Sequence, residues 1–177
     1  MPTTFHVFVG WDHAVYTHIQ DLVLETLKAI PSVASVKHFG PRDTSNRVDY
    51  PDVAAEVCNH INEKNAELIA NNKNGAATTE EIAVGILMCG SGIGISIAAN
   101  KMPGIRAALC HDYYTAQMCR QHNNANILCF GARTTGPEVM VQMINVFFTE
   151  AFAGEGTRHA GRVEKIHALE GVKKQSE

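Results

Sequence analysis

Short apolar runs alternate with helical patterns along almost the whole sequence. Five runs end at Gly, Pro, Asp or His, as expected of buried strands, and they cover residues 5–10, 33–39, 82–88, 105–109 and 126–130. Between and after them, residues 16–30, 51–70, 93–101, 113–122 and 137–152 have helical patterns. Because parallel strands need long, usually helical crossovers, the pattern predicts an α/β fold. We expect a Rossmann-like three-layer sandwich with a five-stranded parallel sheet.

The 177 residues fit one main domain with a sizeable core, and we assign residues 1–153 to it. A Gly-Glu-Gly hinge at residues 154–156 precedes a last helical pattern. We expect residues 154–171 to form a C-terminal helical arm that packs on a partner subunit, followed by a disordered tail at 172–177. The polar, Asn- and Gly-rich segment 71–79 is expected to be an exposed loop without a catalytic role.

Charge and cysteine content exclude several classes of protein. The net charge is -3, without the basic patch that a nucleic acid or an anionic membrane would need. Five cysteines form no CxxC pair and lie mostly in apolar runs, which predicts a reducing compartment and no disulfide framework. No apolar run approaches the length of a membrane span. We therefore expect a cytoplasmic protein.

The most informative segment joins a strand to a helix through a glycine-rich turn. Cys89 ends the third apolar run and is followed by Gly90, Ser91, Gly92, Ile93 and Gly94. Free backbone N–H groups in such a turn favour a phosphate or a developing oxyanion. The turn matches neither GxGxxG nor GK[ST], so a nucleotide motif is not met, and a turn without a ligand remains a competing interpretation.

Reactive side chains follow several of the predicted strands. The amides after Cys89 favour its thiolate, which would make it a base or a nucleophile. Asp12 and His13 follow the first strand and can face the same crevice, although a helix cap and a surface histidine would also explain them. The other four thiols are expected to be structural; they are Cys58, Cys110, Cys119 and Cys129.

A second group of polar residues lies later in the sequence. His122 and Asn123 end a predicted helix, where they could serve in catalysis or as a C-cap. Arg158, His159 and Arg162 place cationic groups on one face of the last helix. Together with Arg133 they could clamp a phosphate, although a solvated basic face is the plainer interpretation.

These motifs occur in an order that resembles ribose-5-phosphate isomerase B and its galactose-6-phosphate isomerase relatives. The resemblance covers nearly all of residues 5–170 and departs from the family mainly in Ser91, where many members have Thr, and in a longer segment at 63–81. The matching segments are 10–14 (GWDHA), 49–51 (DYP), 89–101 (CGSGIGISIAANK), 104–107 (GIRA), 116–117 (AQ), 120–123 (RQHN), 131–133 (GAR) and 158–163 (RHAGRV).

The resemblance implies interconversion of ribose 5-phosphate and ribulose 5-phosphate, with no metal and no cofactor. It implies a homodimer with active sites shared between subunits, and it leaves open whether dimers pair further. Cys89 would be the proton-abstracting base, His122 the ring-opening acid, and Ser91 a hydroxyl that shuttles protons. The implied substrate-binding residues are Asp12, His13, Tyr50, Gly90, Gly92, Ile93, Gly94, Asn123, Arg133, Arg158 and Arg162.

Three other functions remain open. A hexose 6-phosphate, galactose or allose, could replace the pentose, because pocket size and not proton chemistry separates them. A nucleotide-binding module would use Asp112, after the next strand, to contact ribose. A thiol redox protein would use Cys89, although the resolving cysteine of CxxC chemistry is missing.

Overall fold

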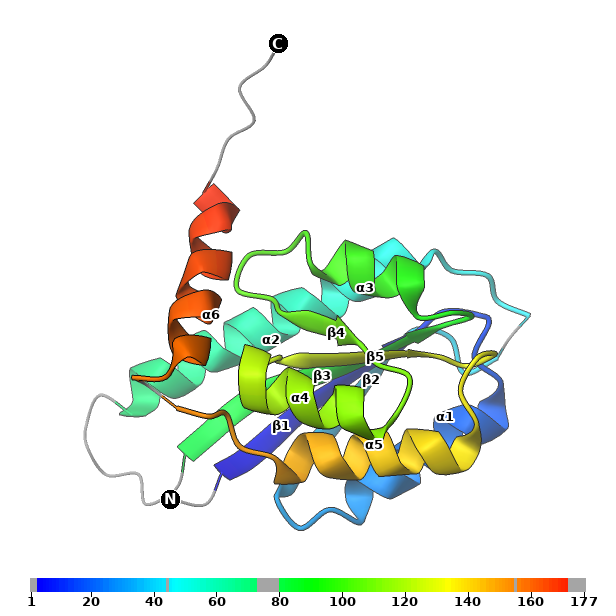
Figure 1. Cartoon of the computed structure of the whole chain (residues 1–177). Helices are drawn as coiled ribbons and strands as arrows, with labels where there is room; N and C mark the ends of the chain where they lie inside the picture. Colours follow the sequence, from blue (N-terminus) through cyan, green and yellow to red (C-terminus); the bar gives the residue numbers. More distant parts are fainter. Residues whose placement is uncertain (1–2, 44, 73–79, 155, 172–177) are drawn as a thin grey trace.

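The computed structural model describes residues 3–43, 45–72, 80–154 and 156–171, and strands alternate with helices as far as residue 149 (Figure 1). Of the predicted loop 71–79, residues 71 and 72 belong to a helix that ends at Asn72, and residues 73–79 lie outside the described residues, as does the predicted tail 172–177. The elements are β1 (Thr3–Trp11), α1 (Thr17–Lys28), β2 (Val33–Phe39), α2 (Tyr50–Asn72), β3 (Glu80–Cys89), α3 (Ile93–Ala99), β4 (Ala107–Leu109), α4 (Tyr113–Asn123), β5 (Ile127–Gly131), α5 (Pro137–Thr149), α6 (Arg158–Ala168) and a 3₁₀ turn (Leu169–Gly171).

The five strands form one parallel sheet in the order β2-β1-β3-β5-β4, which confirms the predicted fold class. The last two strands are exchanged relative to the sequential order of flavodoxin-like sheets. Burial explains this exchange. All five residues of β5 are buried, as in a strand with neighbours on both sides, whereas the three residues of β4 are half-buried, as in a short edge strand.

Helices cover both faces of the sheet and give the molecule its three layers (Figure 1). On one face, α1, α4 and α5 bury side chains such as Val23 and Phe147 in one hydrophobic cluster. On the other face, α2 and α3 bury Val57 and Ile95 in a second cluster. Successive residues of β3 alternate between the two clusters, which is the two-residue period of a strand buried on both sides. Cys89, the last residue of β3, faces the side of α2 and α3.

Helix α5 ends at Thr149, three residues before the predicted end. Glu150 adopts an extended conformation, and its carboxylate accepts hydrogen bonds from Gln117 Nε2 at 2.8 Å and from Gln121 Nε2 at 2.6 Å. Ala153 N also donates to Gln121 O at 2.9 Å. The chain is therefore drawn along α4 instead of continuing as a helix.

Helix α6 contacts its own chain at the edge of the sheet where the strands begin (Figure 1). Thr157 caps it by accepting a hydrogen bond from Ala160 N. Near its end, His167 Nε2 lies 2.7 Å from Arg106 Nη1, and Glu170 Oε2 accepts a hydrogen bond from Gly104 N at 3.0 Å. Within the described residues, no helix is long and apolar enough to cross a bilayer.

Candidate active site

The order of the strands opens a crevice around the end of β3. The chain leaves β1 and β5 toward α1 and α5 on one face, and leaves β3 toward α3 on the other. Neighbouring strands whose connections leave toward opposite faces create the place where open α/β sheets bind ligands. Since β3 lies between β1 and β5, such a place exists on each side of Cys89.

A cavity of about 780 Å³ occupies this place. Nine of the predicted site residues line it, from the loops after β1, β3 and β5 and from the start of α2. The full lining consists of Asp12, His13, Ala14, Val48, Asp49, Tyr50, Cys89, Gly90, Ser91, Ile93, Gly94, Arg133 and Thr134. The sheet thus brings together residues that are more than a hundred positions apart in the sequence.

Cys89 is held by the turn that follows it. Its Sγ atom accepts a hydrogen bond from Gly92 N at 3.2 Å, and a backbone N–H directed at sulfur stabilises a thiolate. Gly92 has φ 76°, and a Cβ atom there would lie 2.6 Å from Leu109 Cδ1 and 2.7 Å from the Phe130 carbonyl carbon. Both the conformation and the space therefore require glycine beneath the thiol.

The loop after β5 is fixed to the loop after β3. Ala132 N donates to Cys89 O at 2.9 Å, and Arg133 N donates to Gly90 O at 3.0 Å. A Cβ atom on Gly90 would lie 3.7 Å from Arg133 Cδ, so the arginine stem runs directly over this glycine. These contacts place a cationic side chain at the rim of the cavity beside Cys89.

Asp12 and His13 form another wall. Asp12 is buried, its N–H donates to Met88 O at 3.3 Å, and its Oδ1 accepts from Ala14 N at 2.9 Å. Helix α1 starts only after Tyr16, so Asp12 folds the turn after β1 and does not cap the helix. His13 Nδ1 lies 3.2 Å from Val48 O, which connects this wall to the loop that precedes α2.

Tyr50, the first residue of α2, forms a further wall of the cavity. A Cβ atom on Gly94 would lie 2.6 Å from Tyr50 Cζ, so the phenol ring packs against the glycine turn.

Asp112, the residue that a nucleotide site would need, forms a capping box instead. Its Oδ1 accepts from Thr115 N at 2.7 Å at the start of α4.

The remaining predicted residues lie elsewhere. His122 and Asn123 are at the end of α4, and Arg158 and Arg162 are in α6, at the edge of the sheet where the strands begin (Figure 1). Asn124, with φ 46°, is the left-handed residue that ends α4, so neither His122 nor Asn123 is its C-cap.

His159, expected only as part of the basic face of the last helix, makes a contact that the sequence did not indicate. The His159 ring stacks on the His122 ring, with centroids 4.1 Å apart and planes 7° from parallel. Partial desolvation lowers the pKa of His159, and the neighbouring His122, Arg158 and Arg162 lower it further. The sequence placed His159 with Arg158 and Arg162 on one basic face, but it gave no signal of the stacking on His122.

All five cysteines are free thiols. Burial raises the pKa of Cys58 to about 12 and raises the pKa of Cys129 well above its ordinary value. Both are therefore neutral side chains that pack in the core. Within the described residues, no three His, Cys, Asp or Glu side chains are grouped so that they could hold a metal ion.

A sequence model described as Ribose/Galactose Isomerase matches residues 7–166. The chain belongs to the ribose/galactose isomerase family. It is 41% identical to ribose-5-phosphate isomerase B of Escherichia coli over 127 residues, which are 72% of this chain and 73% of that protein.

Solved structures of family members extend this similarity to the fold. The type B ribose 5-phosphate isomerase of Leishmania infantum is 45% identical with a TM-score of 0.75, over 96% of this chain and 97% of that one. The enzyme of Trypanosoma brucei is 44% identical with a TM-score of 0.74, over 94% and 99%. The similarity to these two structures thus extends over nearly the whole chain.

Proposed function

We propose that this protein is an aldose-ketose isomerase that interconverts D-ribose 5-phosphate and D-ribulose 5-phosphate. One observation carries the proposal. The Cys89 thiol stands at the switch point of a parallel sheet, accepts a backbone N–H bond, and borders a cavity that Asp12 and Arg133 also line. Family membership and the names of the relatives support the same activity.

In the proposed reaction, a base moves one proton between neighbouring carbons. The Cys89 thiolate removes the proton from C2 of the open aldose, and the electrons form the C1–C2 double bond of an enediolate. The resulting thiol returns the proton to C1, while a proton exchanges between the two oxygens through the Ser91 hydroxyl. Charge on the oxygens is stabilised by N–H groups of the turn at residues 90–94.

The second group of residues leads to a proposal about assembly. His122 would open the sugar ring, Asn123 would orient the open chain, and Arg158 and Arg162 would bind its phosphate with His13 and Arg133. The first four lie at the opposite edge of the sheet from Cys89 (Figure 1). We therefore propose a homodimer in which these four residues of one chain complete the cavity of the other.

Exposed apolar side chains at the starts of α3 and α4 support this arrangement. Ile93 and Ile97, on one face of α3, are 52% and 56% exposed, and Ile93 lines the cavity itself. Tyr113 and Tyr114, at the start of α4, are 49% and 66% exposed. Apolar groups gathered near a functional rim are typical of a surface that another protein covers.

A mixing experiment tests both proposals. Cys89→Ala and His122→Asn each lose ribose 5-phosphate isomerisation alone. In a mixed dimer with shared sites, one site carries both substitutions and the other carries neither. Co-refolding equal amounts should therefore restore about a quarter of wild-type activity, because half of the dimers are mixed and each has one intact site. No recovery, with mixed dimers isolated by two different tags, would contradict the shared site.

The substrate is tested on the same enzyme. We expect isomerisation of ribose 5-phosphate, in the presence of a chelator, to exceed that of allose 6-phosphate and galactose 6-phosphate. Turnover of a hexose phosphate alone would preserve the chemistry and change the substrate. A thermal shift with a nucleotide and no turnover of any sugar phosphate would refute the isomerase.

The location is also a proposal. We propose that the protein works in the cytoplasm, which is supported by its five free cysteines, since such thiols persist in reducing compartments. Fractionation with a compartment marker would test it, and recovery with a secreted or membrane fraction would contradict it.

A further inference from the structure

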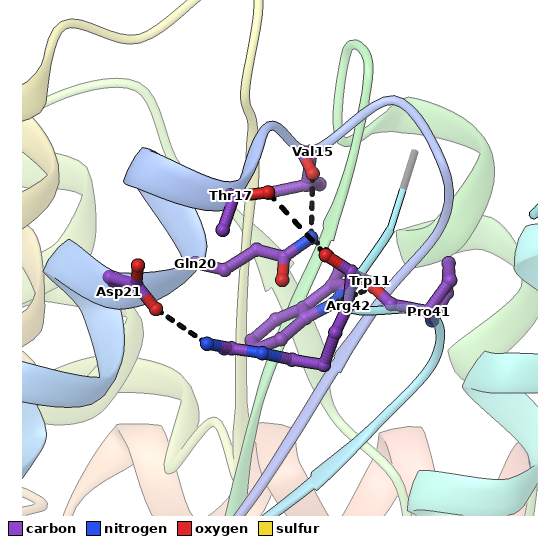
Figure 2. Close-up of polar contacts among 7 residues, drawn as sticks. All are labelled: Trp11, Val15, Thr17, Gln20, Asp21, Pro41 and Arg42. Atoms are coloured by element: carbon purple, nitrogen blue, oxygen red, sulfur yellow. Dashed lines mark hydrogen bonds and ion pairs between the residues drawn. The ribbon is translucent and has the colours of Figure 1, made fainter. Parts of the chain in front are cut away.

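The loop between β2 and α2, residues 40–49, has two distinct ends. Its last residues deliver Val48, Asp49 and Tyr50 to the cavity. Its first residues pack against the end of β1 and the first turns of α1 (Figure 2). The question is which contacts fix the loop at its first end, because the cavity wall depends on them.

Two buried side chains converge on one carbonyl of this loop (Figure 2). Trp11 Nε1 donates to Pro41 O at 2.8 Å, and Gln20 Nε2 donates to the same oxygen at 3.2 Å. Gln20 Nε2 also donates to Val15 O at 2.8 Å. Gln20 and Trp11 are both 0% exposed. A buried amide is costly unless it is hydrogen-bonded, and within the described residues Gln20 Oε1 has no partner. The side chain is therefore held through its Nε2 group alone, which serves two carbonyls.

The neighbouring exposed contacts are much weaker. Arg42 Nη2 lies 2.6 Å from Asp21 Oδ1, with the two side chains 45% and 48% exposed, and Thr17 Oγ1 donates to Arg42 O at 3.4 Å (Figure 2). Exposed ion pairs of this kind contribute little to stability. Two adjacent residues of α1 thus fix the same loop. Gln20 is the buried anchor, and Asp21 is the exposed anchor.

The anchor continues to the cavity through the residues around Asp12. Trp11, directly before Asp12, binds the loop at Pro41, and His13, directly after it, lies 3.2 Å from Val48 O. Gly40, with φ +91°, brings the loop so close to β1 that a Cβ atom there would collide with Trp11 O. Displacement of the loop would therefore move the imidazole of His13 as well as the Tyr50 wall.

We propose that Gln20 is a positioning residue of the active site. Through Pro41 O and Val15 O, it sets the distance between the His13–Tyr50 wall and the Cys89 turn. Its kinetic effect rests on the proposed function, since His13 contacts the phosphate there. Cys89 is held by its own turn through Gly92, so Gln20 acts on substrate binding and leaves the thiol unchanged.

The test compares Gln20→Met, which keeps the size and removes both donors, with Asp21→Asn, which weakens the exposed anchor. For Gln20→Met we expect KM for ribose 5-phosphate to rise roughly tenfold while kcat stays within about threefold. The reason is that the displaced wall would bind the substrate and the transition state equally less tightly. The rate of Cys89 alkylation by iodoacetamide should not change. Asp21→Asn should behave like the wild type in all three measurements.

A fall in kcat accompanied by a changed rate of Cys89 alkylation would show a general structural role and overturn the proposal. An unchanged KM would also overturn it. If Gln20→Met does not fold, Trp11→Phe removes the other donor to Pro41 O, and we expect the same rise of KM alone, at about threefold, since each neutral hydrogen bond contributes modestly.

Hydrogen exchange separates this proposal from the proposed function. If the wild type does not isomerise ribose 5-phosphate, the function is wrong, but the anchor can still be measured. Amide exchange across residues 45–50 should quicken in Gln20→Met and stay at the wild-type rate in Asp21→Asn. Equal exchange in the two variants would refute the anchor itself.

Discussion

The two edges of the sheet carry the two halves of the predicted site in different ways. Where the strands end, Cys89 and its neighbours are set by backbone hydrogen bonds between β3, its turn and the loop after β5. Where the strands begin, His122 and the two α6 arginines project from helices, and both arginines are exposed. We call Cys89 and its neighbours the built-in half, because the sheet itself fixes them. We call His122, Arg158 and Arg162 the peripheral half, because they lie on helices at the rim of the molecule.

The difference indicates what each half is able to do alone. A thiol held by a strand end and a glycine turn keeps its geometry without a ligand, which suits a base that must meet one carbon atom. Exposed cations on a terminal helix suit capture of a phosphate, where reach matters more than exact position. The base and the exposed cations of α6 thus lie at opposite edges of the sheet within one chain, and the proposed homodimer would bring them together.

The largest effect is expected at the built-in half. Cys89→Ala should lower kcat by about a thousandfold or more, since general base catalysis contributes factors of roughly 10² to 10⁴ and Cys89 is the proposed base. Thermal unfolding should change by a few degrees at most. The matched control is Cys129→Ala, which removes a buried thiol from the adjacent strand β5 and should keep activity. Near-normal turnover in Cys89→Ala would disprove its role.

The next effect tests the peripheral half. His122→Asn should lower turnover of ribose 5-phosphate by about a hundredfold, as expected for loss of a general acid. Erythrose 4-phosphate cannot form a furanose ring, because its phosphate occupies the oxygen that would close it. With this substrate the same variant should lose far less. An equal loss on both substrates would show that His122 does not act in ring opening.

Much of this division could be predicted from the sequence. Strand ends are marked by the change from apolar to polar residues, so Asp12, His13 and the turn after Cys89 were placed at one edge without a structure. The exchange of β4 and β5 was harder to foresee, because strand order depends on which strand is flanked on both sides. Only burial distinguishes the apolar run of β5 from that of β4.

Contacts between distant side chains could not be predicted. The early end of α5 depends on Glu150 meeting two amides of α4, and these lie about thirty residues earlier. Gln20 carries no motif, and its role follows from the place where the β2–α2 loop crosses β1. His159 lay inside a recognised motif, but its stacking on His122 depends on the packing of α6 against α4.

A smaller effect is expected for two arginines, one at each edge of the sheet. Arg162→Ala and Arg133→Ala should each raise KM for ribose 5-phosphate by roughly 10- to 100-fold, since a hydrogen bond to a charged group contributes about 1.5 to 3 kcal/mol. In both variants kcat should fall much less. Steady-state rates over a range of ribose 5-phosphate concentrations that spans KM would measure both constants. A normal KM in Arg162→Ala would confine phosphate binding to the edge that holds Cys89.

The smallest effect concerns the stacked histidines. Partial desolvation lowers the pKa of His159 first, and the positive charges of His122, Arg158 and Arg162 lower it further. Replacing His122 with Asn removes one of these charges, so the pKa of His159 should rise, and its imidazolium should persist to a higher pH than in the wild type. An NMR titration of the histidine ring protons would measure the shift, with Lys37→Ala, on the edge strand β2, as a control that leaves His159 unchanged. Unchanged titration of His159 in His122→Asn would mean that the two rings do not face each other in solution, and the peripheral half would then lack the ordered pair that the stacking indicates.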